Sequence, residues 1–309
     1  MAVYEHLYGA YEGESHSARQ RFLVIPRYAL REVFKSKLLV TIFILCFIYP
    51  LIATILVYLH HNANALAVLQ INVRELLPID ASFFQTFLEV QGAFALILTV
   101  LVAPPLISRD LANNALPLYL CRPLSRAEYV LGKMMVVVFL LSLVTWIPGL
   151  LIFFFQVSLA GLAWLWANLW MIWAIFCGSM VWIILLSLLA LAVSSLVKWR
   201  VVASGALLGL FFVSSAFGEI INDLFLTRAG HLISLWASIN SIWGGLFGLF
   251  VRQTGAINGK VTNPIYDKKF FDIVLLEPPL WVSWLIIALV CALCVWILAR
   301  KVRAYEVIK

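Results

Sequence analysis

Residues 134–197 read MMVVVFLLSLVTWIPGLLIFFFQVSLAGLAWLWANLWMIWAIFCGSMVWIILLSLLALAVSSLV, without a single Asp, Glu, Lys, Arg or His. A spanning helix needs about 20 apolar residues, so this stretch is long enough for two of them. In hydrocarbon every backbone N–H and C=O group must be bonded within the protein, which helices achieve. The stretch therefore predicts a helical hairpin in a membrane, from Met134–Phe155 and Ala167–Val197, with a kink at Pro148-Gly149.

The chain as a whole has the same character. All 309 residues together are 64% apolar and 12% charged with a mean hydropathy of +1.01, whereas a soluble domain has about 25% charged residues. This predicts an all-α, polytopic membrane protein. The six expected spans are Leu38–Leu59, Val90–Ile107, Met134–Phe155, Ala167–Val197, Val201–Gly218 and Leu280–Ala299.

The distribution of basic residues predicts the orientation. Most of the 22 Lys and Arg residues lie on the inner side if both termini are cytoplasmic. The pI of 9.2 is then a sign of topology, and no nucleic-acid partner is implied. Residues 1–18 lack the basic-then-apolar order of a cleavable signal, so the first span is expected to direct insertion. We expect a bacterial cytoplasmic (inner) membrane location, with a polar tail at 1–18, the spans within 38–300 and a second cytoplasmic tail at 301–309.

Residues 19–37 precede the first span and read RQRFLVIPRYALREVFKSK. Helical spacing places three basic side chains, Arg27, Arg31 and Lys35, on one face and apolar side chains on the other. This pattern predicts an amphipathic helix at the inner membrane surface. The alternative is a cytoplasmic tail helix that satisfies the charge rule and has no other role.

The outer segment 219–279 contains a second uncharged run, Leu232–Val251. Its large apolar residues form one stripe, and Ser, Asn and Gly residues form the opposite face. This favours an interfacial or re-entrant outer helix packed on the protein. A seventh span is the alternative, but it would expose the basic residues of 300–309 to the outside.

Several chemistries lack the residues that they need. No ionisable side chain lies near the middle of any expected span, which argues against ion-coupled carriers, haem proteins and intramembrane aspartyl proteases. No span contains His, and neither Gly-Lys pair belongs to a phosphate-binding loop. The four cysteines within spans are interpreted as apolar fillers, Cys121 is expected to face the cytosol, and His60-His61 alone does not make a metal site. We expect no catalytic residue, no metal and no cofactor held by this chain.

The segment 109–133 is the charged and proline-bearing connection between two spans; with the two preceding residues it reads ISRDLANNALPLYLCRPLSRAEYVLGK. Leu111–Leu120 is expected to form a short helix with Asp110 as its N-cap. Arg122-Pro123 ends it, and Ser125 begins the helix that enters the next span. A helix tethered in this way can pass a push from a partner into both spans. The alternative is an ordinary charged loop.

This segment resembles the permease subunits of type-2 ATP-binding-cassette (ABC) exporters. The matching residues are Asp110, Leu116–Leu120, Pro123-Leu124-Ser125-Arg126 and Leu131-Gly132-Lys133. The family more often has Glu at the first position. The resemblance implies a coupling helix over Asp110–Arg122 that fits a groove on a separate ATPase, and a lesser contact at Ser194–Arg200. The contact residues implied are Asp110, Leu111, Leu116, Tyr119, Arg122, Pro123, Ser125, Arg126, Lys198 and Arg200.

The resemblance also implies partners and a mechanism. The ATPase subunit would bind ATP and magnesium, and a second permease, identical or paralogous, would complete the path within membrane lipids; further membrane or periplasmic subunits are also possible. The apolar lining favours a lipid-like or amphipathic substrate, with Phe43, Phe47, Phe94, Phe211, Phe212 and Phe217 as candidates for the path. The main alternative is a non-transporting membrane anchor or mechanotransmitter. A channel or carrier acting alone is disfavoured by the uncharged spans.

Overall fold

The computed structural model describes residues 24–62, 78–113, 125–197, 199–225, 227–250, 253–254 and 275–301. Within them, six helical stretches have the length and apolar character needed to cross a membrane. They are Lys37–His61, Ala81–Ser108, Arg126–Ala160, Trp170–Leu196, Arg200–Phe225 and Leu280–Lys301. The prediction of a helical, multi-pass membrane protein is confirmed at this level.

The first stretch comprises α2 (Lys37–Leu45) and α3 (Ile48–His61), and the second comprises α6 (Ala81–Val102) and the first part of α7 (Pro104–Ala112). The third comprises α9 (Arg126–Val144) and α10 (Trp146–Ala160). The remaining spans are α12 (Trp170–Leu196), α13 (Arg200–Phe225) and α15 (Leu280–Lys301). The shorter elements are α1 (Val24–Lys35), α11 (Leu162–Asn168), η2 (Ala229–Leu232), α14 (Leu235–Leu246) and the antiparallel pair β1 (Gln253–Thr254) and β2 (Leu275–Leu276).

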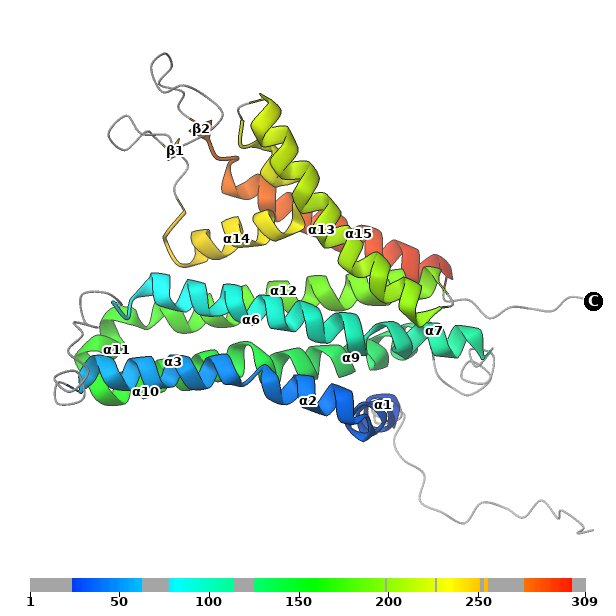
Figure 1. Cartoon of the computed structure of the whole chain (residues 1–309), viewed down its shortest axis with the longest axis horizontal. Coiled ribbons are helices and arrows are strands. Elements are labelled where there is room, and N and C mark those ends of the chain that lie inside the picture. Colours follow the sequence, from blue (N-terminus) through cyan, green and yellow to red (C-terminus); the bar gives the residue numbers. More distant parts are fainter. Residues whose placement is uncertain are drawn as a thin grey trace, which may run out of the picture.

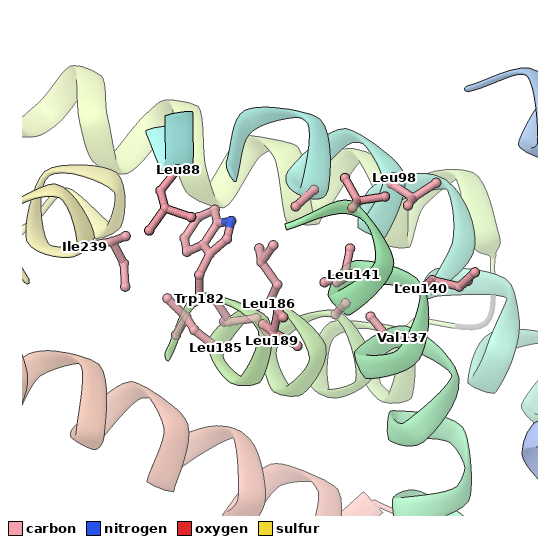
Figure 2. Close-up of a cluster of buried hydrophobic side chains, with 14 of the residues drawn as sticks. Leu88, Leu98, Val137, Leu140, Leu141, Trp182, Leu185, Leu186, Leu189 and Ile239 are labelled. Carbon is pink, nitrogen blue, oxygen red and sulfur yellow. The ribbon is translucent and has the colours of Figure 1, made fainter. Parts of the chain in front are cut away.

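Helix α12 is the central element, and every other span except the first packs against it. It contacts α6, α9, α10, α13 and α15, and 72% of its most apolar stretch is buried inside the protein. Figure 2 shows part of the core, where Trp182, Leu186 and Leu189 of α12 face Leu88 and Leu98 of α6 and Leu141 of α9. The uncharged run of 134–197 thus contributes the centre of the bundle as well as a membrane hairpin.

Prolines break three of the spans, and a side chain from another helix compensates each break. A proline has no N–H, so the carbonyl four residues earlier loses its helical partner. The Gln91 amide donates to two such carbonyls, Cys46 at 2.9 Å (freed by Pro50) and Val144 at 2.7 Å (freed by Pro148). At the α6–α7 break, which precedes Pro104, the Ser204 hydroxyl donates to the Val100 carbonyl at 2.8 Å. Each of these three carbonyls therefore accepts a hydrogen bond from a side chain, as the membrane interior requires.

The kink expected at Pro148-Gly149 lies slightly earlier in the chain. The structure breaks the helix at Thr145, between α9 and α10. The physical reason is that a proline disrupts the turn that precedes it, where its ring and missing N–H act on residue 144. The predicted kink is correct in its cause, and its position is corrected by about one turn.

The segment 219–279 contains a short helix, α14, that packs between the spans. In Figure 1, α13 and α15 diverge from the other spans, and α14 lies in the space between. It contacts α15, α12, α13 and α6. Its apolar stripe is buried through Leu235, Ile239, Ile242 and Trp243. The run Leu232–Val251 therefore contains a packed helix of 12 residues, too short to be a seventh span.

Charged residues separate strongly between the two ends of the bundle. We call the end where α2, α9 and α13 begin the basic end, and the opposite one the acidic end (Figure 1). Described Lys and Arg side chains at the basic end are Arg27, Arg31, Lys35, Lys37, Arg126, Lys133, Arg200, Arg300 and Lys301. At the acidic end the described part of the chain has Arg228 with Asp80, Glu89, Glu219, Asp223 and Glu277.

Candidate functional site

The candidate site lies at the basic end, where α7 and α9 flank residues 114–124. Helix α7 is fixed to the end of α12 by a hydroxyl group. The Ser194 hydroxyl donates to the Pro104 carbonyl at 2.7 Å and accepts from the Ser108 N–H at 3.0 Å. It thus bridges an N–H and a C=O group of the first turn of α7. Helix α7, which leads into the first expected ATPase contact, therefore lies beside Ser194, where the second expected contact begins.

A buried ion pair joins α7 to α9. Lys133 Nζ lies 2.9 Å from Asp110 Oδ2, and the Tyr129 hydroxyl donates to the same oxygen at 2.7 Å. Lys133 is 7% exposed and Tyr129 is fully buried. Removing one partner of a buried pair leaves an uncompensated charge, at a cost of about 3–5 kcal/mol. The ion pair and the Tyr129 hydrogen bond therefore join the two helices beside residues 114–124, which connect them.

Asp110 does not have the local role that its sequence suggested. It was expected to cap a helix over Leu111–Leu120, but it lies in the last turn of α7, Pro104–Ala112. The helix begins earlier because Pro104 and Pro105 suit a first helical turn. The carboxylate then reaches across to Lys133 and Tyr129 in place of the backbone N–H groups ahead of it. The N-cap assignment of Asp110 is wrong.

Ser125 begins the following helix, as its sequence predicts. Its hydroxyl accepts from the Glu128 N–H at 3.2 Å, and its own N–H donates to Glu128 Oε2 at 2.6 Å. This is a capping box, in which each residue satisfies a free donor of the other. The start of α9 is therefore fixed locally, independently of any partner.

The other predicted contact residues divide into two groups. Arg126 and Arg200 are exposed, and both lie in the first turn of their helices. Leu111 lies in α7, but Leu116, Tyr119, Arg122, Pro123 and Lys198 lie outside the described residues. The helix predicted over Leu111–Leu120 lies outside them as well, apart from its first two residues in α7.

Residues of the predicted inner-surface helix and of the predicted path are partly described. Arg27, Arg31 and Lys35 are exposed on α1, whose Ile25 is buried against Gly132 of α9. Phe211 is 3% exposed and packs edge-on against Trp182, which makes it a core residue of this chain. Phe47, Phe212 and Phe217 are exposed on the apolar surface, while Phe43 and Phe94 are half-buried.

Residues that the sequence did not identify hold this site together. They are Tyr129, Ser108 and Ser204, together with the hydroxyl of Ser194. The sequence does contain a signal for Tyr129, because this residue lies four positions before Lys133 and therefore on the same helical face. It contains no signal for the roles of Ser194 and Ser204, because their partners are backbone groups distant in sequence.

The described residues contain no cluster of three His, Cys, Asp or Glu side chains suited to a metal ion. His61, in the last turn of α3, has its Nδ1 atom 3.2 Å from the Val57 carbonyl. No protein-family model matches this chain, and no curated protein matches its sequence significantly.

Proposed function

We propose that this chain is the permease subunit of an ABC exporter, driven by a separate ATPase that binds ATP and magnesium. One observation carries the proposal. The two helices that flank residues 114–124, α7 and α9, are joined by the Asp110–Lys133 ion pair, and a capping box fixes the start of α9. A force applied to that segment would reach α6 through α7, and α9 directly.

The proposal extends to the substrate and the assembly. A lipid-like or amphipathic substrate fits the apolar surface, which includes Phe47, Phe212 and Phe217 and carries no described charge near the middle of the spans. A second permease would contribute the other half of the path. The amphipathic helix α1 would lie at the inner face of a bacterial cytoplasmic membrane, with both termini cytoplasmic.

Co-purification with the ATPase from native membranes tests the proposal. We expect Leu116→Asp, Arg122→Glu and Arg126→Glu each to reduce the ATPase recovered by at least about tenfold while membrane insertion is unchanged. Asp223→Arg, an exposed charge reversal at the acidic end, is the matched control. Purification of this chain without any ATPase subunit, or unchanged recovery in all three variants, contradicts the proposal.

The variant Tyr129→Phe distinguishes an exporter from a membrane anchor. Tyr129→Phe removes one hydrogen bond at the base of the segment without altering its surface. An exporter should keep its ATPase bound but lose part of the ATPase activity that a substrate stimulates in lipid. An anchor should show the same ATPase activity in both forms, with or without candidate substrates.

A further inference from the structure

A pocket of about 1110 Å³ opens at the basic end of the bundle. Helix α1 and the start of α2 form one wall, and the first residues of α13 form the other; α6 and α7 form its floor. Figure 1 shows α1, α7 and the beginning of α13 together at this end. The pocket exceeds the range of about 300–1,000 Å³ typical of small-molecule sites.

The lining of the pocket is divided by polarity. Leu39, Leu101, Val102, Leu106 and Val201 contribute an apolar part. Basic side chains come from both walls, Arg31 and Lys35 from α1 and Arg200 from α13. A ligand that satisfies both parts must have an apolar portion and an anionic portion.

The charges of the pocket do not cancel. Its lining includes the basic residues Arg31, Lys35, Lys133 and Arg200 and the acidic residues Glu32 and Asp110. Asp110 is already paired with Lys133. Arg31, Lys35 and Arg200 form no ion pair with any residue in the described part of the chain. Positive charge therefore remains beside an apolar surface.

The pocket lies at the ends of two spans, where hydrocarbon is expected to give way to headgroups. Two of the spans that border it begin at Lys37 and Arg200, so its basic residues lie at the ends of apolar helices. Trp199, which precedes Arg200, is 76% exposed, as expected of a tryptophan in the membrane interface. The N-terminus of α13 adds the positive end of its helix dipole to the same wall.

We propose that this pocket holds one anionic phospholipid. Its phosphate lies among Arg31, Lys35 and Arg200, and its acyl chains follow Leu101, Leu106 and Val201. Arginine pairs with phosphate oxygens through two parallel N–H groups, and basic pockets between helices at a membrane surface are suited to acidic headgroups. A lipid there would connect α1 to α13, which otherwise form separate walls of the pocket. The proposal concerns this chain alone and does not depend on an ATPase or on transport.

Native mass spectrometry of the full chain in detergent tests the proposal, with phosphatidylglycerol and phosphatidylcholine of identical acyl chains as probes. We expect wild-type protein to bind phosphatidylglycerol at least about tenfold more tightly. The combined variant Arg31→Gln/Lys35→Gln/Arg200→Gln should bind phosphatidylglycerol roughly 100-fold more weakly. Each basic residue near the headgroup adds to the electrostatic attraction of the anionic lipid. Equal affinity of wild-type protein for the two lipids overturns the proposal.

The control removes as much charge from the same end, outside the pocket: Arg27→Gln/Lys37→Gln/Lys301→Gln. It should keep the wild-type preference; an equal loss in the control means that general surface charge attracts the lipid, and the proposal fails. Val201→Trp fills the apolar part while every charge stays, and it should weaken binding about tenfold. Unchanged binding in Val201→Trp places the lipid elsewhere.

A soluble probe separates a lipid from a free phosphate ligand. Glycerol phosphate carries the anionic group without acyl chains, so it should not displace phosphatidylglycerol at equal concentration. Displacement at equal concentration assigns the pocket to a soluble phosphate compound and overturns the lipid assignment. Because no ATPase is present, none of these outcomes depends on the proposed export function.

Discussion

Gln91 forms hydrogen bonds to the proline breaks of two different spans. Its side chain is fully buried in α6, and its amide donates to the Cys46 and Val144 carbonyls. The sequence shows the prolines and predicts that helices break, but it does not show which residue compensates them. That depends on the rotation of α6 between α2–α3 and α9–α10. A single uncharged polar residue in an apolar span was therefore not recognised as important.

We predict that Gln91→Leu destabilises the protein by about 1–3 kcal/mol, because two buried carbonyls lose their donor. The thermal midpoint measured in lipid nanodiscs should fall. Gln85→Leu is the matched control: Gln85 lies on the same helix but bonds to Glu89 near the acidic end. A Gln91→Leu midpoint no lower than that of the control would show that the two hydrogen bonds contribute little.

At the scale of elements, helix α14 shows what hydrophobic periodicity can and cannot predict. The apolar stripe of Leu232–Val251 indicated a helix packed on the protein, and α14 is that helix. Its small residues also pack: a Cβ atom on Gly245 would lie 2.5 Å from Leu280 Cδ2 of α15. The sequence could not assign that contact, since glycine on a helix is equally compatible with solvent and with a close neighbour.

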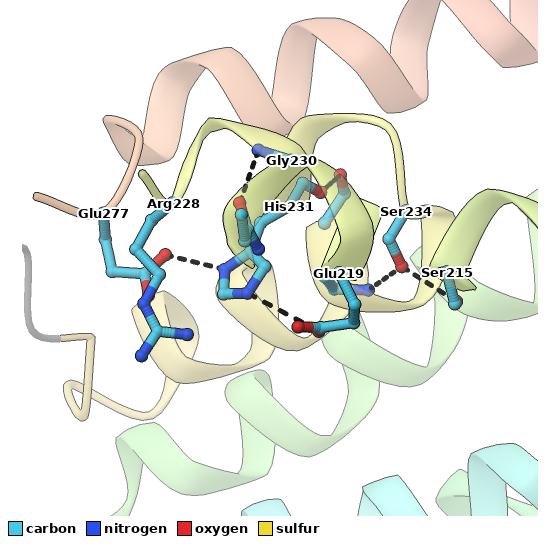
Figure 3. A network of polar contacts seen from close by, with 10 residues as sticks. Ser215, Glu219, Arg228, Gly230, His231, Ser234 and Glu277 are labelled. Atoms are coloured by element: carbon cyan, nitrogen blue, oxygen red, sulfur yellow. Dashed lines mark hydrogen bonds and ion pairs between the residues drawn. The ribbon is translucent and has the colours of Figure 1, made fainter. Parts of the chain in front are cut away.

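A polar network fixes this segment at the acidic end (Figure 3). His231 Nδ1 lies 2.9 Å from Glu277 Oε2, which precedes α15, and its Nε2 lies 3.9 Å from Glu219 Oε1 of α13. The Gly230 N–H donates to Asn222 Oδ1 at 2.7 Å. These contacts join α13, η2 and the residues before α15, so the three elements should move as one unit.

The approach of η2 to α13 depends on a pair of glycines. A Cβ atom on Gly218 would lie 2.5 Å from the Gly230 carbonyl oxygen, which is rigid backbone. Gly218→Val should therefore displace η2, break the His231–Glu277 contact and cost about 1–3 kcal/mol. Gly209→Val on the same helix is the control, because nothing lies within 4 Å of its added Cβ. The thermal midpoint of both variants checks this, and equal midpoints would contradict the packing described.

At the scale of the whole molecule, hydropathy predicts the spans and leaves their arrangement open. Apolar length alone identified six spans, and charge identified one end of the bundle as basic. Local signals identified boundaries only in part: Ser125 begins α9, but Asp80, which was not singled out, caps α6 at Ala81, before the expected Val90. The divergence of α13 and α15 from the other spans was not predictable, because it depends on the side chains of α14 that pack between these helices.

Basic residues concentrate at one end, and this predicts which end faces the cytoplasm, because Lys and Arg near spans are retained on that side. Ala127 at the basic end and Thr227 at the acidic end are exposed. In intact bacterial cells, a membrane-impermeant maleimide should label Thr227→Cys and should label Ala127→Cys only after permeabilisation. Both changes are made in a Cys121→Ser background, and that background without either new cysteine is the control. The other four cysteines are buried or half-buried within the spans. Labelling of Ala127→Cys in intact cells, with Thr227→Cys protected, would invert the orientation and remove the segment between α7 and α9 from the reach of any cytoplasmic ATPase.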